Sequence, residues 1–178
     1  QAIGTNATTQ AGNYALSKDI DASATSLWNF EAGFLPVSSF TGNFDGHGHT
    51  ISNGKFQVGL FGSTAVGSAV RNVGIINAVV TGYDSVGTLV GINRGSVTNA
   101  YSGGIVTGNG TNAGGLVGLN FGGCISNSYS SSSVVGTNSY GSSFGGLVGK
   151  NKAGGTITNS YSIGSVTASG YNVGGLVG

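Results

Sequence analysis

The stretch Ala113-Gly114-Gly115-Leu116-Val117-Gly118 decides the fold of this chain, because close variants of it occur five times. The copies begin at residues 58, 86, 113, 144 and 173, so successive copies are 28, 27, 31 and 29 residues apart. A fixed period of this size is the signature of a protein built from stacked repeats. We therefore read residues 58–85, 86–112, 113–143 and 144–172 as repeat units, with an incomplete fifth at 173–178.

The composition excludes several classes of protein. Glycine supplies 36 of the 178 residues, but a single proline argues against collagen or a proline-rich linker. Hydrophobic residues make up 38% and recur at fixed positions, which argues against disorder. Charged residues amount to only 6%, with a net charge of +1, so no basic face is available for nucleic acid. No apolar stretch approaches the ~20 residues that a membrane-spanning helix needs.

Each repeat carries three short apolar runs rich in β-branched residues, and turn-forming Gly, Asn and Ser separate them. In one unit these runs are Leu116-Val117, Ile125–Tyr129 and Val134-Val135. None is long enough for a helix. Three strands per unit of ~28 residues describe one coil of a parallel β-helix, whose coils lie ~4.8 Å apart. We expect an all-β solenoid of about six coils, on the order of 30 Å long.

Stacking of coils would place equivalent side chains above one another. It predicts an asparagine ladder, a tyrosine column and a set of glycines at the coil corners. The glycines would adopt positive φ and allow close approach of the adjacent coil. The alternation within each run places the Asn and Tyr side chains inward or at a corner. The Tyr column is either a packed ladder, which we favour, or a sugar-binding strip. The predicted ladder residues are Asn72, Asn99, Asn127, Asn159, Tyr101, Tyr129 and Tyr161, and the corner glycines are Gly59, Gly87, Gly114, Gly115, Gly145, Gly146, Gly174 and Gly175.

Residues 1–57 differ from the repeats, because their coils are longer and rich in Trp and Phe. We expect irregular N-terminal coils here, either covering one end of the β-helix or continuing a longer one. The stop at Gly178, just as a repeat begins, suggests a segment cut from a longer protein.

Candidate chemistry is sparse. Asp45, His47 and His49 could bind a metal or share protons, but intervening glycines favour a turn at a coil corner. Asp19 and Asp21 form an acidic pair without the glycine-rich calcium phrase of secreted repeats. No acid follows Asp84, so a groove with the paired carboxylates of a polysaccharide-cleaving enzyme is not expected. We predict no enzyme activity, catalytic residue, metal or cofactor.

Three segments carry a resemblance to a known family. Residues 14–23 with 28–30, the run Phe40–Asn53 and the glycine phrases together resemble the filamentous-haemagglutinin-like bacterial surface exoproteins that carry GLUG motifs. The resemblance covers residues 12–178 approximately. It implies a right-handed β-helix, export across a Gram-negative envelope, and a role in adhesion or the extracellular matrix.

The leading hypothesis is therefore a non-enzymatic, secreted β-helical rod at a bacterial cell surface. Its partners would be a host or matrix glycan or protein, with no nucleic acid and no membrane span. Two alternatives remain: a filament subunit that stacks end to end, and a scaffold for a larger surface enzyme.

Overall fold

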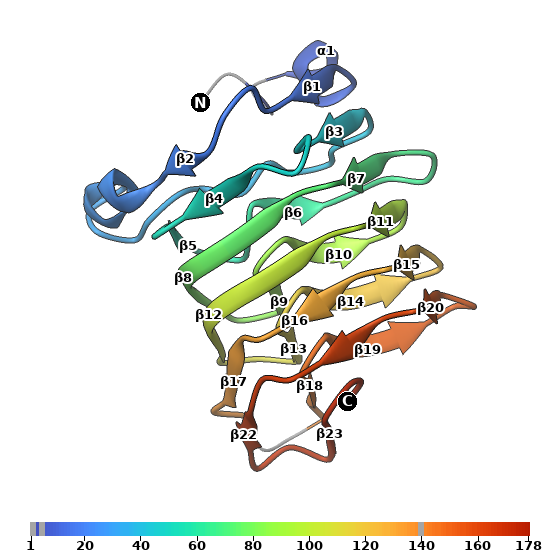
Figure 1. Ribbon diagram of the computed structural model, residues 1–178. Helices are drawn as coiled ribbons and strands as arrows, with labels where there is room; N and C mark the ends of the chain where they lie inside the picture. The colour runs from blue at the N-terminus through green and yellow to red at the C-terminus, as the bar shows by residue number, and fades with distance from the viewer. Residues whose placement is uncertain (1–2, 4–5, 139–140) are drawn as a thin grey trace.

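The computed structural model describes residues 3, 6–138 and 141–178. The chain folds as a right-handed parallel β-helix of about six turns. Figure 1 shows the chain winding from its N-terminus at one end of the stack to its C-terminus at the other. Among these described residues, helix is confined to α1 (Ala7–Gln10) and a 3-10 turn, η1 (Ser23–Leu27). The predicted all-β solenoid is confirmed.

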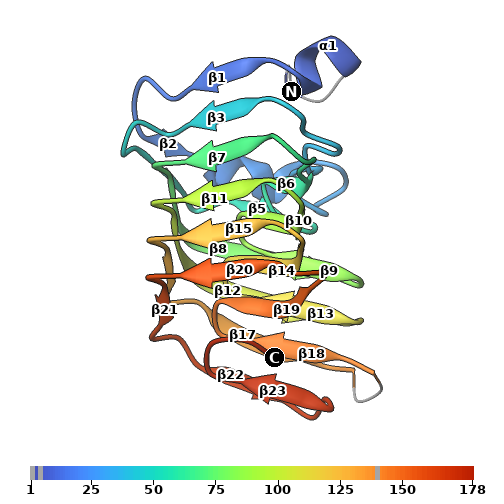
Figure 2. The same cartoon turned by 90° about the vertical axis from the view of Figure 1, so that its right-hand side faces the viewer.

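The strands form four parallel ladders, which we number in the order in which a coil visits them. Sheet 1, which faces the viewer in Figure 2, contains β1 (Asn13–Ala15), β3 (Asn43–Asp45), β7 (Ala69–Arg71), β11 (Ser96–Thr98), β15 (Cys124–Ser126) and β20 (Thr156–Thr158). Sheet 2 contains β2 (Ile20–Asp21), β4 (Thr50–Ser52), β5 (Lys55–Phe56), β8 (Gly74–Gly82), β12 (Tyr101–Gly108), β16 (Tyr129–Ser130), β17 (Ser133–Gly136), β21 (Tyr161–Ser162) and β22 (Val166–Ala168).

Sheets 3 and 4 complete each turn. Sheet 3 contains β9 (Ser85–Gly87), β13 (Asn112–Gly114), β18 (Ser143–Gly145) and β23 (Asn172–Gly174). Sheet 4 contains β6 (Phe61–Ser63), β10 (Val90–Asn93), β14 (Val117–Phe121) and β19 (Val148–Lys152).

The fourth ladder is a correction to the expected three strands per coil. The glycine phrase is not a single strand, because it bends between sheets 3 and 4. β13 ends at Gly114, and β14 begins at Val117. Leu116 turns its fully buried side chain into the core at this corner. The short strand before the bend is too rich in small residues to stand out in the sequence.

The strand pairing between successive coils places equivalent positions of the sequence repeat opposite each other. Val70, Val97 and Ile125 are paired in sheet 1, and all three are fully buried. Like residues thus pack on like along the axis, with Leu89, Leu116 and Leu147 forming a second buried column. The wider N-terminal coils are filled by aromatic rings instead, and the Phe40 and Phe61 centroids are 4.9 Å apart.

Candidate functional site: ladders and the polar corner

The outer asparagines lie at the corner between sheets 1 and 2. Asn72, Asn99, Asn127 and Asn159 all adopt left-handed backbone conformations, with φ between 48° and 54°. Asparagine tolerates this region better than most residues. The amide of Asn99 donates to Asn72 Oδ1 at 3.1 Å, and the amide of Asn72 donates to Asp45 Oδ1 at 3.0 Å. These hydrogen bonds therefore connect Asn99 and Asn72, in the repeats, to Asp45 in the preceding coil.

The left-handed residues also correct the expected role of the glycines. Among the predicted corner glycines only Gly59, at φ 155°, has positive φ, so the four ladder asparagines, and not the phrase glycines, supply the left-handed residue at the corner between sheets 1 and 2. The phrase glycines serve close packing instead. A Cβ on Gly87 would lie 2.6 Å from the backbone nitrogen of Gly118 in the next coil.

The asparagine corner leads to a testable prediction. Replacing Asn99 by Ala should cost about 1–2 kcal/mol, because Ala has the full penalty of a left-handed conformation, whereas the short polar side chain of Asn tolerates it. Asn99→Gly is the matched control, because glycine keeps this conformation without the penalty. Urea unfolding should therefore rank the Ala variant below the Gly variant. Equal stability, or the reverse order, would show that backbone conformation does not explain the asparagine.

The three tyrosines form a continuous stack on sheet 2. The ring centroids of Tyr101 and Tyr129 are 5.2 Å apart, those of Tyr129 and Tyr161 are 5.1 Å apart, and both pairs are inclined by only 4°. Ser102, the next residue in the strand, is fully buried, so the Tyr101 ring lies on the outer surface. This differs from the expected inward or corner position, because the left-handed asparagine interrupts the alternation.

Each face of the Tyr129 ring is covered by a neighbouring tyrosine, which leaves the ring edges as the main surface of the column. Burial raises the pKa of the Tyr101 hydroxyl, with smaller effects from Tyr129 and Asp19. This geometry favours a packed ladder over a sugar-stacking strip.

Asp45 is the centre of a group of polar side chains in the N-terminal coils, which we call the polar corner and which includes His47, Arg71 and Asn72. Its Oδ1 accepts from the amide of Asn72 and from the backbone N–H of His47, at 3.0 and 2.9 Å. Its Oδ2 accepts from Arg71 Nε at 2.7 Å. The Asn72 and His47 hydrogen bonds, helped by Arg71, hold the pKa of the Asp45 carboxyl far below 3.8, although burial opposes them.

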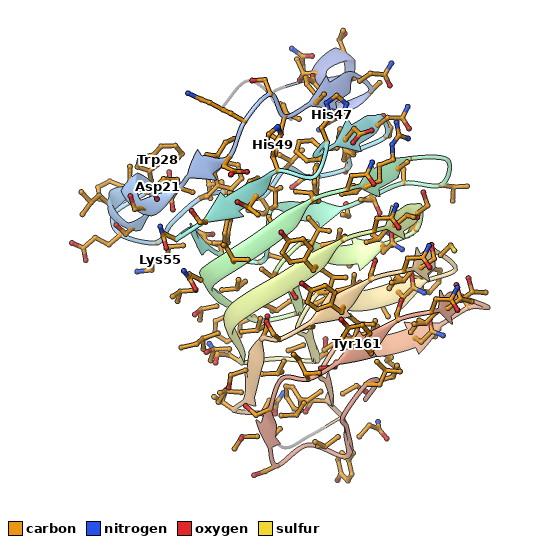
Figure 3. All side chains as sticks on the ribbon, viewed as in Figure 1. Asp21, Trp28, His47, His49, Lys55 and Tyr161 are labelled. Atoms are coloured by element: carbon orange, nitrogen blue, oxygen red, sulfur yellow. The ribbon has the colours of Figure 1, made fainter. Side chains whose placement is uncertain are left out.

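The two histidines, both labelled in Figure 3, approach different carboxylates. His47 Nε2 is 3.9 Å from Asp45 Oδ2, whereas His49 Nδ1 is 3.2 Å from Asp19 Oδ1 in the preceding coil. Asp19 also accepts from the backbone N–H of Thr50, and these contacts lower the pKa of its carboxyl. In the described part of the chain, no group of three or more His, Cys, Asp or Glu side chains is placed to hold a metal ion.

Asp45 makes the stability of the corner depend on pH. Its pKa is lower in the folded protein, so its stabilising contribution is complete above 3.8 and declines as pH falls below that value. Asp45→Asn should therefore destabilise the protein near pH 6, and the difference from wild type should shrink as the pH approaches 2. Unfolding free energies across this range provide the measurement. If the difference in unfolding free energy between the variant and the wild type stays constant with pH, the Asp45 carboxylate is not the source of the stabilisation.

A second asparagine ladder lies inside the β-helix, and the sequence reading missed it. Asn93 and Asn120 are fully buried, and Asn93 Nδ2 donates to Asn120 Oδ1 at 2.8 Å. Asn120 Nδ2 donates to Asn151 Oδ1, also at 2.8 Å, and Thr64 Oγ1 donates to Asn93 Oδ1. The signal was present, because each of these asparagines follows the Val of the phrase by three residues.

The polar side chains inside the β-helix form hydrogen bonds with one another and with the backbone. The carbonyl oxygen of Gly115 accepts from Thr88 Oγ1 at 2.6 Å and from Ser102 Oγ at 2.8 Å. No buried side-chain nitrogen or oxygen in residues 3, 6–138 and 141–178 lacks a partner. The interior thus combines apolar columns with polar ladders that fix the register between coils.

Comparison with known proteins supports the repeat. The GLUG motif is found at residues 140–167, so this part of the sequence-based resemblance is confirmed. Halomucin of Haloquadratum walsbyi (strain DSM 16790 / HBSQ001) is 42% identical over 135 residues, which are 66% of this chain. The chain spans only 2% of the length of Halomucin.

A solved structure from Bacteroides ovatus, provisionally described as an immunoglobulin A1 protease, is 17% identical. The match covers 92% of this chain and 77% of that chain, with a TM-score of 0.45, and it supports no conclusion about function. Among the described residues, no helix has the length and apolar character that crossing a membrane requires.

Proposed function

We propose that this chain is a rigid, non-enzymatic segment of a secreted cell-surface protein, which holds other regions of that protein at a distance and contributes to adhesion. The observation that carries the proposal is the uninterrupted ladder of sheet 1, in which β1, β3, β7, β11, β15 and β20 are paired in sequence. Every coil is thereby hydrogen-bonded to its neighbours, and deformation of one coil strains the next.

The comparisons support the cell-surface part of this proposal. The GLUG motif and the similarity to a protein named as a mucin both fit a structural role outside the cell. The link to filamentous-haemagglutinin-like adhesins and the Gram-negative origin rest on the sequence resemblance. Adhesion to a host or matrix component is the finer part of the proposal.

Pulling the chain from its two ends in an optical trap tests the rod. We expect discrete unfolding steps in which whole coils of 27–31 residues are released. Each step should add on the order of 100 Å of extended chain, at ~3.5 Å per residue. Smooth extension at low force would contradict a rigid spacer.

Electron microscopy and sedimentation of the purified chain distinguish the rod from a filament subunit. Short discrete particles support the spacer, whereas indefinite fibres support end-to-end stacking through unpaired strand edges. Adhesion is tested separately, by measuring whether beads coated with the folded chain attach to extracellular polymers more than beads coated with the heat-unfolded chain.

A further inference from the structure

A loop of residues 28–33 leaves the β-helix beside sheet 2 and extends beyond the stack of coils. Figure 3 shows Trp28 on this loop with Lys55 close by, at the side of the molecule where the blue segment protrudes. The loop is closed by its own hydrogen bonds. The backbone N–H of Gly33 donates to the carbonyl of Trp28 at 3.0 Å, and Asn29 Nδ2 donates to the carbonyl of Gly33 at 2.7 Å.

The loop contains the most unusual backbone in the described chain. Asn29, Phe30 and Glu31 are consecutive non-glycine residues with φ of 53°, 56° and 63°. A bulky residue in this region is an outlier that the surrounding structure must enforce. Packing does not compensate at Phe30, because its side chain is fully exposed, at 105%. Strain that places an aromatic ring in solvent points to a binding role.

A groove of about 620 Å³ lies beside this loop. The loop contributes Glu31 and Ala32, and the second coil after it contributes Tyr83, which is 74% exposed. The remaining lining residues are Lys55, Gln57, Val58, Thr81 and Gly82.

The lining combines an aromatic ring with hydrogen-bonding groups of both kinds. The Glu31 carboxylate accepts, the Lys55 ammonium donates, and the amide of Gln57 and the hydroxyl of Thr81 can do both. Pyranose sugars match this set, because their C–H faces pack on aromatic rings while their hydroxyls both donate and accept. The opposite charges of Glu31 and Lys55 compensate each other, so the groove favours a neutral ligand over a polyanion.

We propose that the groove between loop 28–33 and Tyr83 binds a segment of a neutral polysaccharide, with Tyr83 as the aromatic contact inside the groove. Phe30, which is exposed on the same loop but is not part of the groove lining, would contact the polymer where it leaves the groove. This names the ligand class for the adhesive part of the proposed function and rests on that part. The rigid-spacer part of the proposed function is tested by the force measurement alone. A failure of polysaccharide binding can therefore be distinguished from a failure of the spacer role.

Native affinity electrophoresis tests the proposal, using gels that contain dextran, galactomannan or xyloglucan, with alginate as the acidic polymer. We expect at least one neutral polymer to retard the wild-type chain. Tyr83→Ala and Phe30→Ala should each weaken that retardation at least tenfold. Tyr171→Ala is the matched control, because Tyr171 is about as exposed as Tyr83, at 72%, and belongs neither to the groove lining nor to loop 28–33.

A second variant separates lost binding from lost folding. Phe30→Gly should raise the midpoint of thermal unfolding by relieving the left-handed strain, and it should weaken retardation as Phe30→Ala does. The proposal is overturned if no neutral polymer retards the wild type, or if alginate alone does. It is also overturned if the Tyr83 and Phe30 variants migrate like the wild type in the polymer gels.

Discussion

Asn120→Asp is expected to destabilise the protein by on the order of 3–5 kcal/mol near neutral pH, the usual cost of an uncompensated buried charge. The substitution preserves the shape of the side chain but removes the Nδ2 donor. The new carboxylate would face Asn151 Oδ1, which accepts from Asn120 Nδ2 at 2.8 Å in the native protein. It would also be fully desolvated, because Asn120 is 0% exposed.

Asn151→Asp is the matched control for this substitution. Asn151 belongs to the same ladder but is exposed, so water can solvate the charge. Its substitution should cost less than about 1 kcal/mol beyond the loss of one hydrogen bond, from Asn151 Nδ2 to the carbonyl of Gly155. Urea unfolding of both variants at pH 7 and pH 4 checks this. Burial raises the pKa of an isolated carboxyl, so the penalty at position 120 should ease at pH 4. Equal costs at the two positions would refute the buried ladder.

Gly115→Ala is expected to cost about 3 kcal/mol, at the upper end of the range for overpacking a core. A Cβ at this position would overlap Ser130 Oγ and the backbone carbonyl of Gly146 in the next coil. Backbone cannot move aside as a flexible side chain can. The shift would also disturb the carbonyl of Gly115, which accepts from Thr88 and Ser102.

Gly175→Ala provides the control, because Gly175 is the second glycine of the fifth phrase and a Cβ there meets nothing within 4 Å. Its expected effect on the free energy of unfolding is within about 0.5 kcal/mol, as for ordinary exposed positions. Comparison of the two variants by urea unfolding isolates the effect of the neighbouring coil. If both substitutions are equally tolerated, close approach of coils is not what the glycine phrase provides.

The repeat period made the overall fold predictable, because a 27–31-residue period with three β-branched runs leaves few alternatives to a stacked coil. The bend inside the phrase was not predictable in the same way. Residues such as Ser85 and Gly87 have weak strand propensity, and sheet 3 forms because adjacent coils present matching partners. Pairing with the adjacent coils, rather than local strand propensity, therefore determines that these residues form strands.

The members of the tyrosine stack could be predicted from the repeat, but the orientation of their side chains could not. Alternation along a strand would put Val97, Asn99 and Tyr101 on one face. The left-handed conformation of Asn99 breaks that alternation, so Val97 is buried and Tyr101 lies outside. The groove beside Tyr83 could not be read from the sequence, because residues 31, 55 and 83 meet only through the stacking of three coils.

Stepwise distances along sheet 1 test the central claim that each repeat is one coil stacked on the next. A spin label at Thr156 would be paired with a second label at Ala69, Asn43 or Asn13, in a Cys124→Ser background. These residues occupy one row of the sheet, three, four and five strands from Thr156. Double electron–electron resonance should give mean distances that grow by ~5 Å per coil, near 14, 19 and 24 Å. Distances that fail to increase in this order would contradict the stacked β-helix.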